Sequence, residues 1–149
     1  MLDLNSARYD AARIERGVWW AIHVTADRRF GGKALRGDPG DEPALLIRPA
    51  DVEWDRACDA ARAPYLRDVR LKELSPADNR KIMAQAMAKA LWRGANKIAV
   101  GGKPFEWSEA EAARMLADPE WWSLQDFIWY AAQDRAALAA EEEAKASGN

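Results

Sequence analysis

The 149-residue sequence predicts an α+β fold, mostly α-helical, in which a small N-terminal β-hairpin or sheet packs on a bundle of about four helices. Residues 18–25 are rich in β-branched and aromatic side chains that alternate between two faces, as in a half-buried strand. From Asp51 onward, apolar residues instead recur with the spacing of a buried helix face. Residues that begin and end helices separate these apolar stretches.

The first third of the chain supplies the expected β-structure. Residues 4–16 predict a short amphipathic helix that ends at Gly17, and the strand of residues 18–25 follows. Residues 26–43 contain many glycines and prolines and are expected to form a loop before a second strand at residues 44–48. Two strands alone are only marginally stable in water, so this sheet must pack on helices or on a partner.

The central residues supply two expected helices. Asp51 is a suitable N-cap for a helix that stops at Pro64. Ser75 followed by Pro76 is a stronger start signal, because it combines a capping hydroxyl with proline at the first helical position. We expect this second helix to end at Gly94.

The C-terminal residues predict a hairpin or extended arm and two more helices. The arm covers residues 97–107 and contains a Gly-Gly pair at its turn. Ser108 begins a capping box for a short helix, and Asp118 begins a last helix that runs to about Ala140. A chain of this length makes one domain, so we expect a single domain over residues 1–149. Its parts are a β-containing segment (1–50), a helical part (51–140) and a flexible tail (141–149).

The charge balance and the cysteine count exclude several classes of protein. The chain has 22 basic and 24 acidic residues, and a net charge of −2 argues against binding nucleic acid through phosphate contacts. The single cysteine excludes an internal disulfide and fits a reducing compartment. No apolar run approaches the roughly 18–20 residues of a membrane span. We therefore expect a cytoplasmic protein that binds neither nucleic acid nor membrane.

No residue pattern in the chain points to catalysis. His23 is the only histidine and lies in an expected strand, where a structural role is favoured over a catalytic triad. Cys58 is alone on a helix face, which favours a buried inert thiol over a catalytic one. The pair Gly101 and Gly102 is explained by a turn and belongs to no phosphate-binding motif. The sequence therefore predicts no enzyme activity, no cofactor and no metal site.

Large apolar side chains are the unusual feature, because the chain has eight tryptophans. On the last helix, Trp122 and Trp129 fall on the polar side, opposite the core stripe that contains Phe127 and Ile128. A surface stripe that binds another protein explains this placement, and the alternative is that another element covers the rings. The residues that we predict to bind protein are Trp122, Trp129, Trp107, Phe105, Met83 and Met87.

Five segments in succession resemble a known family, beginning with a β segment at residues 16–19 and a capped helix at residues 74–92. Residues 102–108 read Gly-Lys-Pro-Phe-Glu-Trp-Ser, residues 112–119 end in Leu-Ala-Asp-Pro, and residues 124–135 end in Ala-Ala-Gln-Asp-Arg. This order resembles the tail assembly chaperones of long-tailed bacteriophages and related phage-like particles. The resemblance extends over about residues 13–138 and implies a non-catalytic role in tail assembly.

The resemblance implies particular partners. Such a chaperone binds the tape measure protein, keeps it soluble and recruits tail tube subunits around it. It acts in the bacterial host cytoplasm and is absent from the mature particle, with a homo-oligomer left open. The leading alternative is a permanent structural protein of the virion, either a minor tail or a tail-terminator protein that forms rings. A DNA-binding module that uses residues 75–91 and an unrecognised hydrolase are less favoured, because of the net charge and the single histidine.

Overall fold

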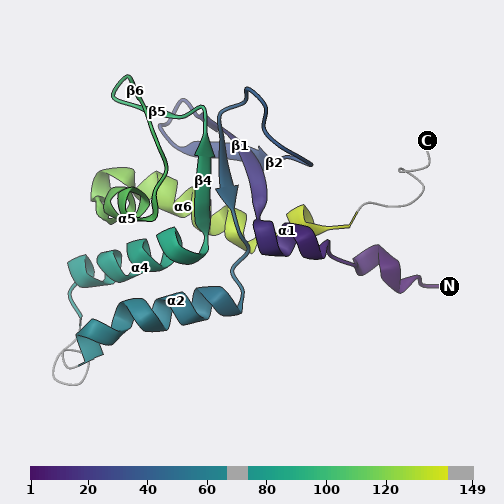
Figure 1. The fold of residues 1–149 in the computed structure, drawn as a ribbon, viewed down its shortest axis with the longest axis horizontal. Coiled ribbons are helices and arrows are strands. Elements are labelled where there is room, and N and C mark those ends of the chain that lie inside the picture. Colours follow the sequence, from purple (N-terminus) through teal and green to yellow (C-terminus); the bar gives the residue numbers. More distant parts are fainter. Residues whose placement is uncertain (67–73, 141–149) are drawn as a thin grey trace.

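The computed structural model describes residues 1–66 and 74–140, and it confirms the α+β fold (Figure 1). The strands are β1 (Val18–Val24), β2 (Phe30–Ala34), β3 (Ala44–Ile47), β4 (Trp92–Asn96), β5 (Ala99–Val100) and β6 (Lys103–Pro104). The α-helices of the described ranges are α1 (Ala11–Arg16), α2 (Val52–Arg62), α4 (Pro76–Ala90), α5 (Glu109–Ala117) and α6 (Trp122–Gln133). Short 3₁₀ helices are η1 (Leu4–Ala7), η2 (Ala63–Tyr65), η3 (Pro119–Trp121) and η4 (Arg135–Leu138). The expected flexible tail, 141–149, lies outside the described residues.

The main sheet is larger than the sequence predicts. Its strands run antiparallel in the order β2-β1-β3-β4, whereas residues 26–43 were expected to form only a loop. Strand β2 includes Gly31 and Gly32, which resemble loop residues in a single sequence. A Cβ atom at Gly32 would lie 2.4 Å from the carbonyl oxygen of Ala21 and 3.0 Å from the ring of Phe127. Glycine is therefore required here by the close approach of strand and helix.

Side chains on β1 and β3 alternate between the two faces of the sheet. Trp20 and Leu45 are paired across the strands, and both are buried toward α6. Trp20 packs edge-on against the Phe127 ring of α6, with ring centroids 6.0 Å apart. Trp19 and Leu46 form the next pair on the opposite face, and both are half-buried. Helix α6 thus covers one face of the sheet, behind the strands in the view of Figure 1.

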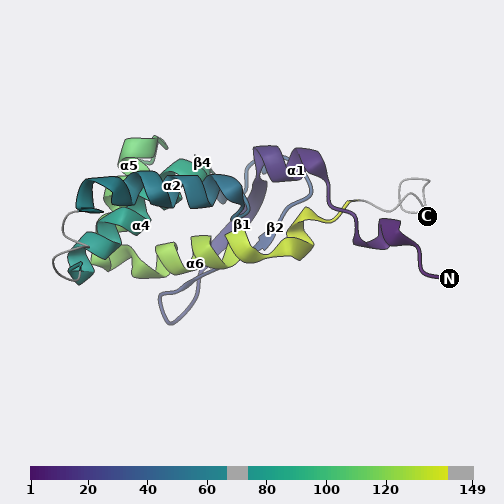
Figure 2. The same ribbon diagram turned by 90° about the horizontal axis from the view of Figure 1, so that it is seen from below.

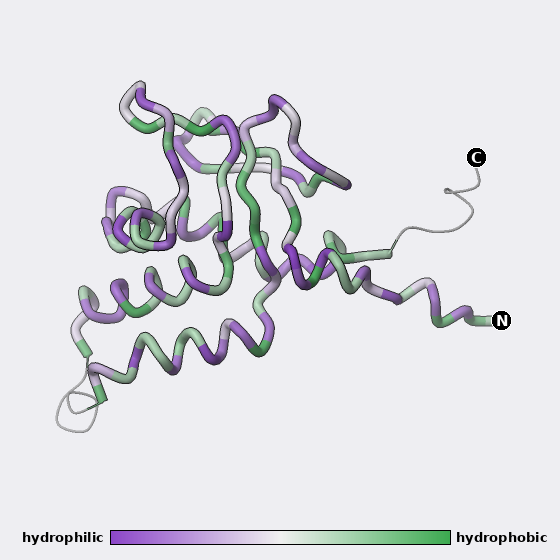
Figure 3. Tube along the Cα trace, in the orientation of Figure 1, coloured by the Kyte–Doolittle hydropathy of each residue, from purple (hydrophilic) through white to green (hydrophobic). Residues whose placement is uncertain are grey.

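Helices α2, α4 and α5 stack at one end of the sheet. Helix α4 packs against α2 on one side and against α5 on the other, and Figure 2 shows α2 and α4 side by side. Six of the eight alanines of α2 and α4 are buried, namely Ala57, Ala61, Ala84, Ala86, Ala88 and Ala90. Small side chains let the helices approach closely. In Figure 3, hydrophobic residues lie along the central strands, while α2 and α4 alternate between hydrophilic and hydrophobic residues.

Several expected helix ends are wrong. The expected helix 4–16 is divided, because Tyr9 pairs with Ala139 and the Asp10 side chain caps α1. Helix α4 ends at Ala90, with Leu91 as its C-cap, rather than at Gly94, since the next residues pair with β3 as strand β4. The last helix ends at Gln133, where the Asp134 side chain accepts a hydrogen bond from the Ala136 amide and begins a 3₁₀ turn.

Other local predictions are confirmed. Ser75 and Ser108 cap α4 and α5 through their hydroxyl groups, and Asp51 caps α2 through its carboxylate. Strands β5 and β6 form the expected hairpin, whose turn residues Gly101 and Gly102 both have positive φ.

Candidate protein-binding groove

An open groove runs between α4 and α6. On the α4 side, Met83 and Met87 lie one helical turn apart and therefore share a face. Met87 is buried, with 1% of its surface exposed, whereas Met83 is half-buried. The same face continues toward the start of α4 through Pro76, Asn79 and Arg80. The α4 wall is thus apolar at its deep end and polar at its mouth.

The α6 wall carries two of the predicted tryptophans. Trp122 and Trp129 are two turns apart, and Gln125 and Asp126 lie between them. The cavity between the walls has a volume of about 380 Å³. Its lining residues are Pro76, Asn79, Arg80, Met83, Met87, Trp122, Gln125, Asp126 and Trp129. The structure therefore brings together Met83, Met87, Trp122 and Trp129, which the sequence analysis selected separately.

The two tryptophans differ in how they are held. Trp122 is 54% exposed, and the guanidinium of Arg29 lies over its ring at 5.6 Å. Arg29 comes from the turn between β1 and β2, which also contacts α6 where the Ser123 hydroxyl donates to the Arg28 carbonyl oxygen at 3.5 Å. Trp129 is half-buried and packs against Trp54 of α2, with ring centroids 5.3 Å apart. Binding of a partner would therefore restrict mainly the side chain of Trp122, because Trp129 is already held against Trp54 of α2.

Arg80 and Asp126 give the groove one charge of each sign. Neither residue takes part in an ion pair within the described ranges. The groove therefore has an apolar floor, with one positively charged and one negatively charged side chain at its rim. This arrangement suits the apolar face of an amphipathic helix, which carries anchoring side chains at helical spacing.

Sequence reasoning missed Trp54 and Arg80. Nothing in the local sequence indicates that α2 brings Trp54 to the ring of Trp129. Arg80 is one turn before Met83 and Met87 is one turn after it, so the helical spacing would have found Arg80 once Met83 was chosen.

Phe105 and Trp107 lie apart from the groove. Phe105 stacks on Trp92 with ring centroids 5.6 Å apart, and it lines a separate apolar cavity of about 350 Å³ beside the β5–β6 hairpin. Trp107 lies under the guanidinium of Arg93 at 4.9 Å. Both rings hold the segment that connects β6 to α5 against the body of the protein. The six predicted residues therefore do not form one surface.

The residues with catalytic potential are scattered in the structure. His23 is exposed near the end of β1, and burial raises the pKa of the half-buried Cys58 thiol on α2. No group of His, Cys, Asp and Glu that could hold a metal ion is found in residues 1–66 and 74–140. Over the same ranges, no helix has the length and apolar character needed to cross a membrane.

The fold and the groove define an α+β protein with an open aromatic surface between two helices. Residues 50–149 match the YdaY prophage protein family, and the chain belongs to this family. It is therefore a phage-derived protein. The matched residues include both walls of the groove and Trp54 behind it. The chain matches none of the curated proteins and none of the solved structures with which it was compared.

Proposed function

We propose that this chain is a non-catalytic phage tail assembly chaperone. In this role it binds the tape measure protein, keeps it soluble and recruits tail tube subunits. The observation that carries the proposal is the groove, in which Met83 and Met87 face Trp122 and Trp129 across an open cavity. Methionine and tryptophan surfaces adapt to varied apolar partners, as a chaperone of a long helical client requires.

Family membership shows a phage origin, and the resemblance implies the tail assembly role. Membership of a prophage protein family places the chain among phage-derived proteins. The last three segments of the resemblance cover β6, most of α5 and most of α6, and α6 forms one wall of the groove. A client helix in this groove would bury the exposed part of Trp122 and contact Met83. Apolar burial without covalent bonds keeps the complex reversible, so the client can be released.

The proposed chaperone acts at a particular place and with particular partners. The chain acts in the bacterial host cytoplasm, without a cofactor, and leaves before the particle is complete. Its partners are proteins rather than nucleic acid or membrane, and it forms complexes with its client whether or not it self-associates.

Co-expression with the tape measure protein tests this role directly. The full chain is expected to shift the client from the insoluble to the soluble fraction, in a complex that elutes together on size exclusion. A charge in the groove, introduced as Met83→Glu, should abolish that rescue because the client would then bury an unpaired carboxylate. Val52→Glu is a matched control, because Val52 is 56% exposed on α2 and lies outside the groove.

The two variants separate binding from folding. Both variants should give the same circular dichroism spectrum as the unmodified chain. Loss of rescue in the groove variant alone supports the proposal. Equal rescue by both variants would show that the client binds elsewhere, and no rescue by the unmodified chain would remove the chaperone role.

A permanent structural role is the alternative, and one observation favours it. Strand β2 is an edge strand with a single neighbour, β1, so its outer backbone groups can pair with another chain. A minor tail or tail-terminator protein would use such an edge to form rings. Detection of this chain in purified, finished particles would favour that alternative over a chaperone that departs.

A further inference from the structure

A second concave surface lies on the face of the sheet opposite α6. Its floor is formed by the side chains of Trp19 and Leu46 from β1 and β3, together with Leu35 after β2. Helix α1 borders it on one side and residues 36–38 border it on the other. The cavity has a volume of about 570 Å³, larger than the groove between α4 and α6. Trp19 and Leu46 remain half-buried there.

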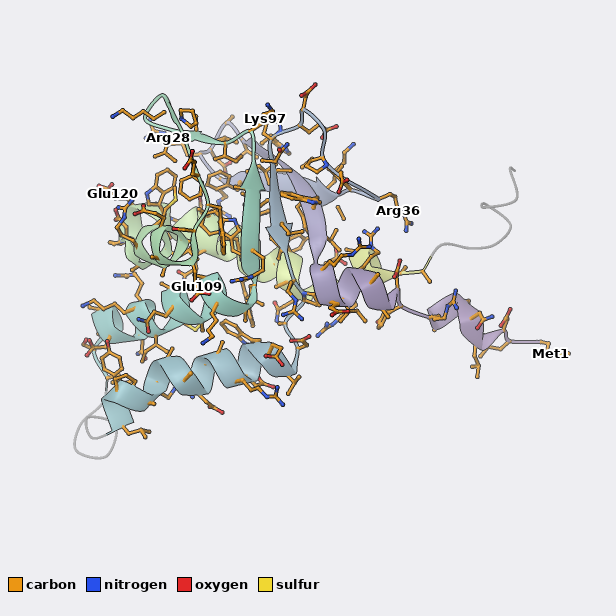
Figure 4. The ribbon with its side chains drawn as sticks, viewed as in Figure 1. Met1, Arg28, Arg36, Lys97, Glu109 and Glu120 are labelled. Atoms are coloured by element: carbon orange, nitrogen blue, oxygen red, sulfur yellow. The ribbon has the colours of Figure 1, made fainter. Side chains whose placement is uncertain are left out.

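Arginine side chains dominate the rim of this cavity. The charged residues that line it are Arg13, Arg16, Arg36 and Asp38. Figure 4 shows Arg36 on the side of the sheet along which α1 runs. The cavity therefore carries an excess of positive charge, although the whole chain has a net charge of −2. A local excess of this kind attracts an acidic partner.

The arginines have different roles. Arg13 is a structural residue, because its guanidinium donates to the carbonyl oxygens of Ala137, Leu35 and Arg36 at 2.9, 3.0 and 3.2 Å. It thereby ties α1 to the segment after β2 and to η4. Arg16 is exposed and makes no hydrogen bond or ion pair within the described part of the chain.

Arg36 is also available to a ligand. Its side chain is exposed, and its one hydrogen bond in the described ranges is a long one, 3.5 Å, to the carbonyl oxygen of Ala139. No described carboxylate pairs with Arg36. Arg16 and Arg36 thus present charge toward the cavity from two segments that Arg13 holds in place.

Close packing at Gly17 fixes α1 against the sheet. Gly17 has a φ of +92°, and a Cβ atom there would lie 3.0 Å from the Ile47 carbonyl oxygen. The same atom would lie 3.2 Å from the Arg48 side chain, which forms an ion pair with Asp51 at 3.6 Å. A side chain at this position would push the turn away from β3. Glycine therefore allows α1, which ends at Arg16, to lie directly beside the start of β1.

We propose that this cavity, named here the arginine cavity, binds an acidic amphipathic segment of another protein. Apolar side chains of that segment lie on Trp19 and Leu46, and its carboxylates pair with Arg16 and Arg36. The fork geometry of arginine suits carboxylates, which accept two parallel hydrogen bonds. This site is distinct from the groove between α4 and α6, so it goes beyond the proposed function and does not depend on it.

A peptide fits the arginine cavity better than a nucleic acid does. Two of the three floor residues, Leu35 and Leu46, are aliphatic, and aliphatic side chains do not stack on bases. The apolar floor instead matches leucine-like side chains. Asp38 at the rim would repel a continuous phosphate backbone, whereas a peptide can place a neutral residue beside it.

Fluorescence anisotropy with a labelled short peptide of alternating leucine and glutamate tests the site. The full chain should bind this peptide, and replacing its glutamates by glutamine or its leucines by serine should remove binding. The double variant Arg16→Gln, Arg36→Gln should weaken binding by about tenfold. The matched control is Arg56→Gln, Arg62→Gln, which removes two exposed arginine charges from α2 and should leave the affinity unchanged.

Three results would overturn the proposal. Equal affinity in the two double variants would show that the peptide responds only to net charge. Tighter binding of a single-stranded oligothymidylate, lost in the arginine-cavity variant, would identify a nucleic-acid site. Peptide binding that appears only in a chain ending at Ala140 would assign the cavity to this chain's own Glu141, Glu142 and Glu143. Circular dichroism of each variant confirms that the fold is kept.

Discussion

The two sides of α6 show how differently one helix can use aromatic residues. Toward the sheet, Phe127 and Ile128 are at most 5% exposed, and Phe127 meets the Trp20 ring edge-on. Toward the groove, Trp122 is 54% exposed, and the half-buried Trp129 packs against Trp54. The first side is packed from several directions, whereas the second has a packed partner at one ring and solvent at the other.

This difference shows that aromatic content does not by itself identify a core. Both sides of α6 bear large rings, yet only one side has a complementary surface within the described chain. A side chain that is already buried stabilises the fold, whereas an exposed ring stabilises a complex with something else. Four experiments on single residues can sharpen or break this distinction.

The largest effect is expected at the packed side. Phe127→Ala removes a ring that contacts Trp20 and approaches the backbone at Gly32, so it leaves a cavity. We expect the free energy of unfolding to fall by about 3–5 kcal/mol. Urea denaturation followed by circular dichroism measures this change. A loss as small as that of an exposed residue would mean that α6 does not pack on the sheet as described.

A smaller loss is expected from adding a methyl group beneath the same ring. Gly32→Ala places a Cβ atom 2.4 Å from the Ala21 carbonyl oxygen, and a backbone atom cannot move aside as a flexible side chain can. We expect a loss of about 1–3 kcal/mol in the same denaturation experiment. Gly37→Ala is the control, because nothing lies within 4 Å of a Cβ atom there. Equal stability of the two variants would contradict the pairing of β1 with β2.

The two groove tryptophans should differ from each other. Trp129→Ala loses the contact with Trp54, and we expect it to cost about 2 kcal/mol, below the value for a fully buried ring. Trp122→Ala should change stability by only about 0.5 kcal/mol, because its ring is mainly in contact with water and with Arg29. Thermal or urea unfolding of the two variants measures this difference. A larger loss of stability in Trp122→Ala than in Trp129→Ala would refute the assignment.

The smallest expected effect is a change in the alkylation rate of Cys58 on the neighbouring helix α2. Cys58 follows Trp54 by one turn on α2, and burial raises the pKa of its thiol. Since the thiolate is the reactive form, iodoacetamide should modify native Cys58 more slowly than the urea-unfolded chain at pH values below about 8.5. The difference should shrink as the pH rises and the native thiol ionises. Equal rates in both states would show that Cys58 is not covered by its neighbours.

Local signals in the sequence identified those elements whose ends depend on adjacent residues. The capping groups of Ser75 and Ser108 act within their own first turn, and the two glycines after Val100 set their own hairpin turn. The core stripe of α6 was equally accessible, because helical spacing alone places Phe127 and Ile128 together.

Only the tertiary structure decided where the chain pairs with distant segments. Strand β2 exists because β1 provides a hydrogen-bonding partner, and Gly94 lies in β4 because β3 is beside it rather than because its own residues favour a strand. The groove depends on the same kind of information. Helical spacing selected Trp122 and Trp129, but the packing of α4 beside α6 determined that Met83 faces them and that Phe105 does not. Contacts between segments far apart in sequence leave no local pattern, since each segment satisfies its own preferences in more than one arrangement.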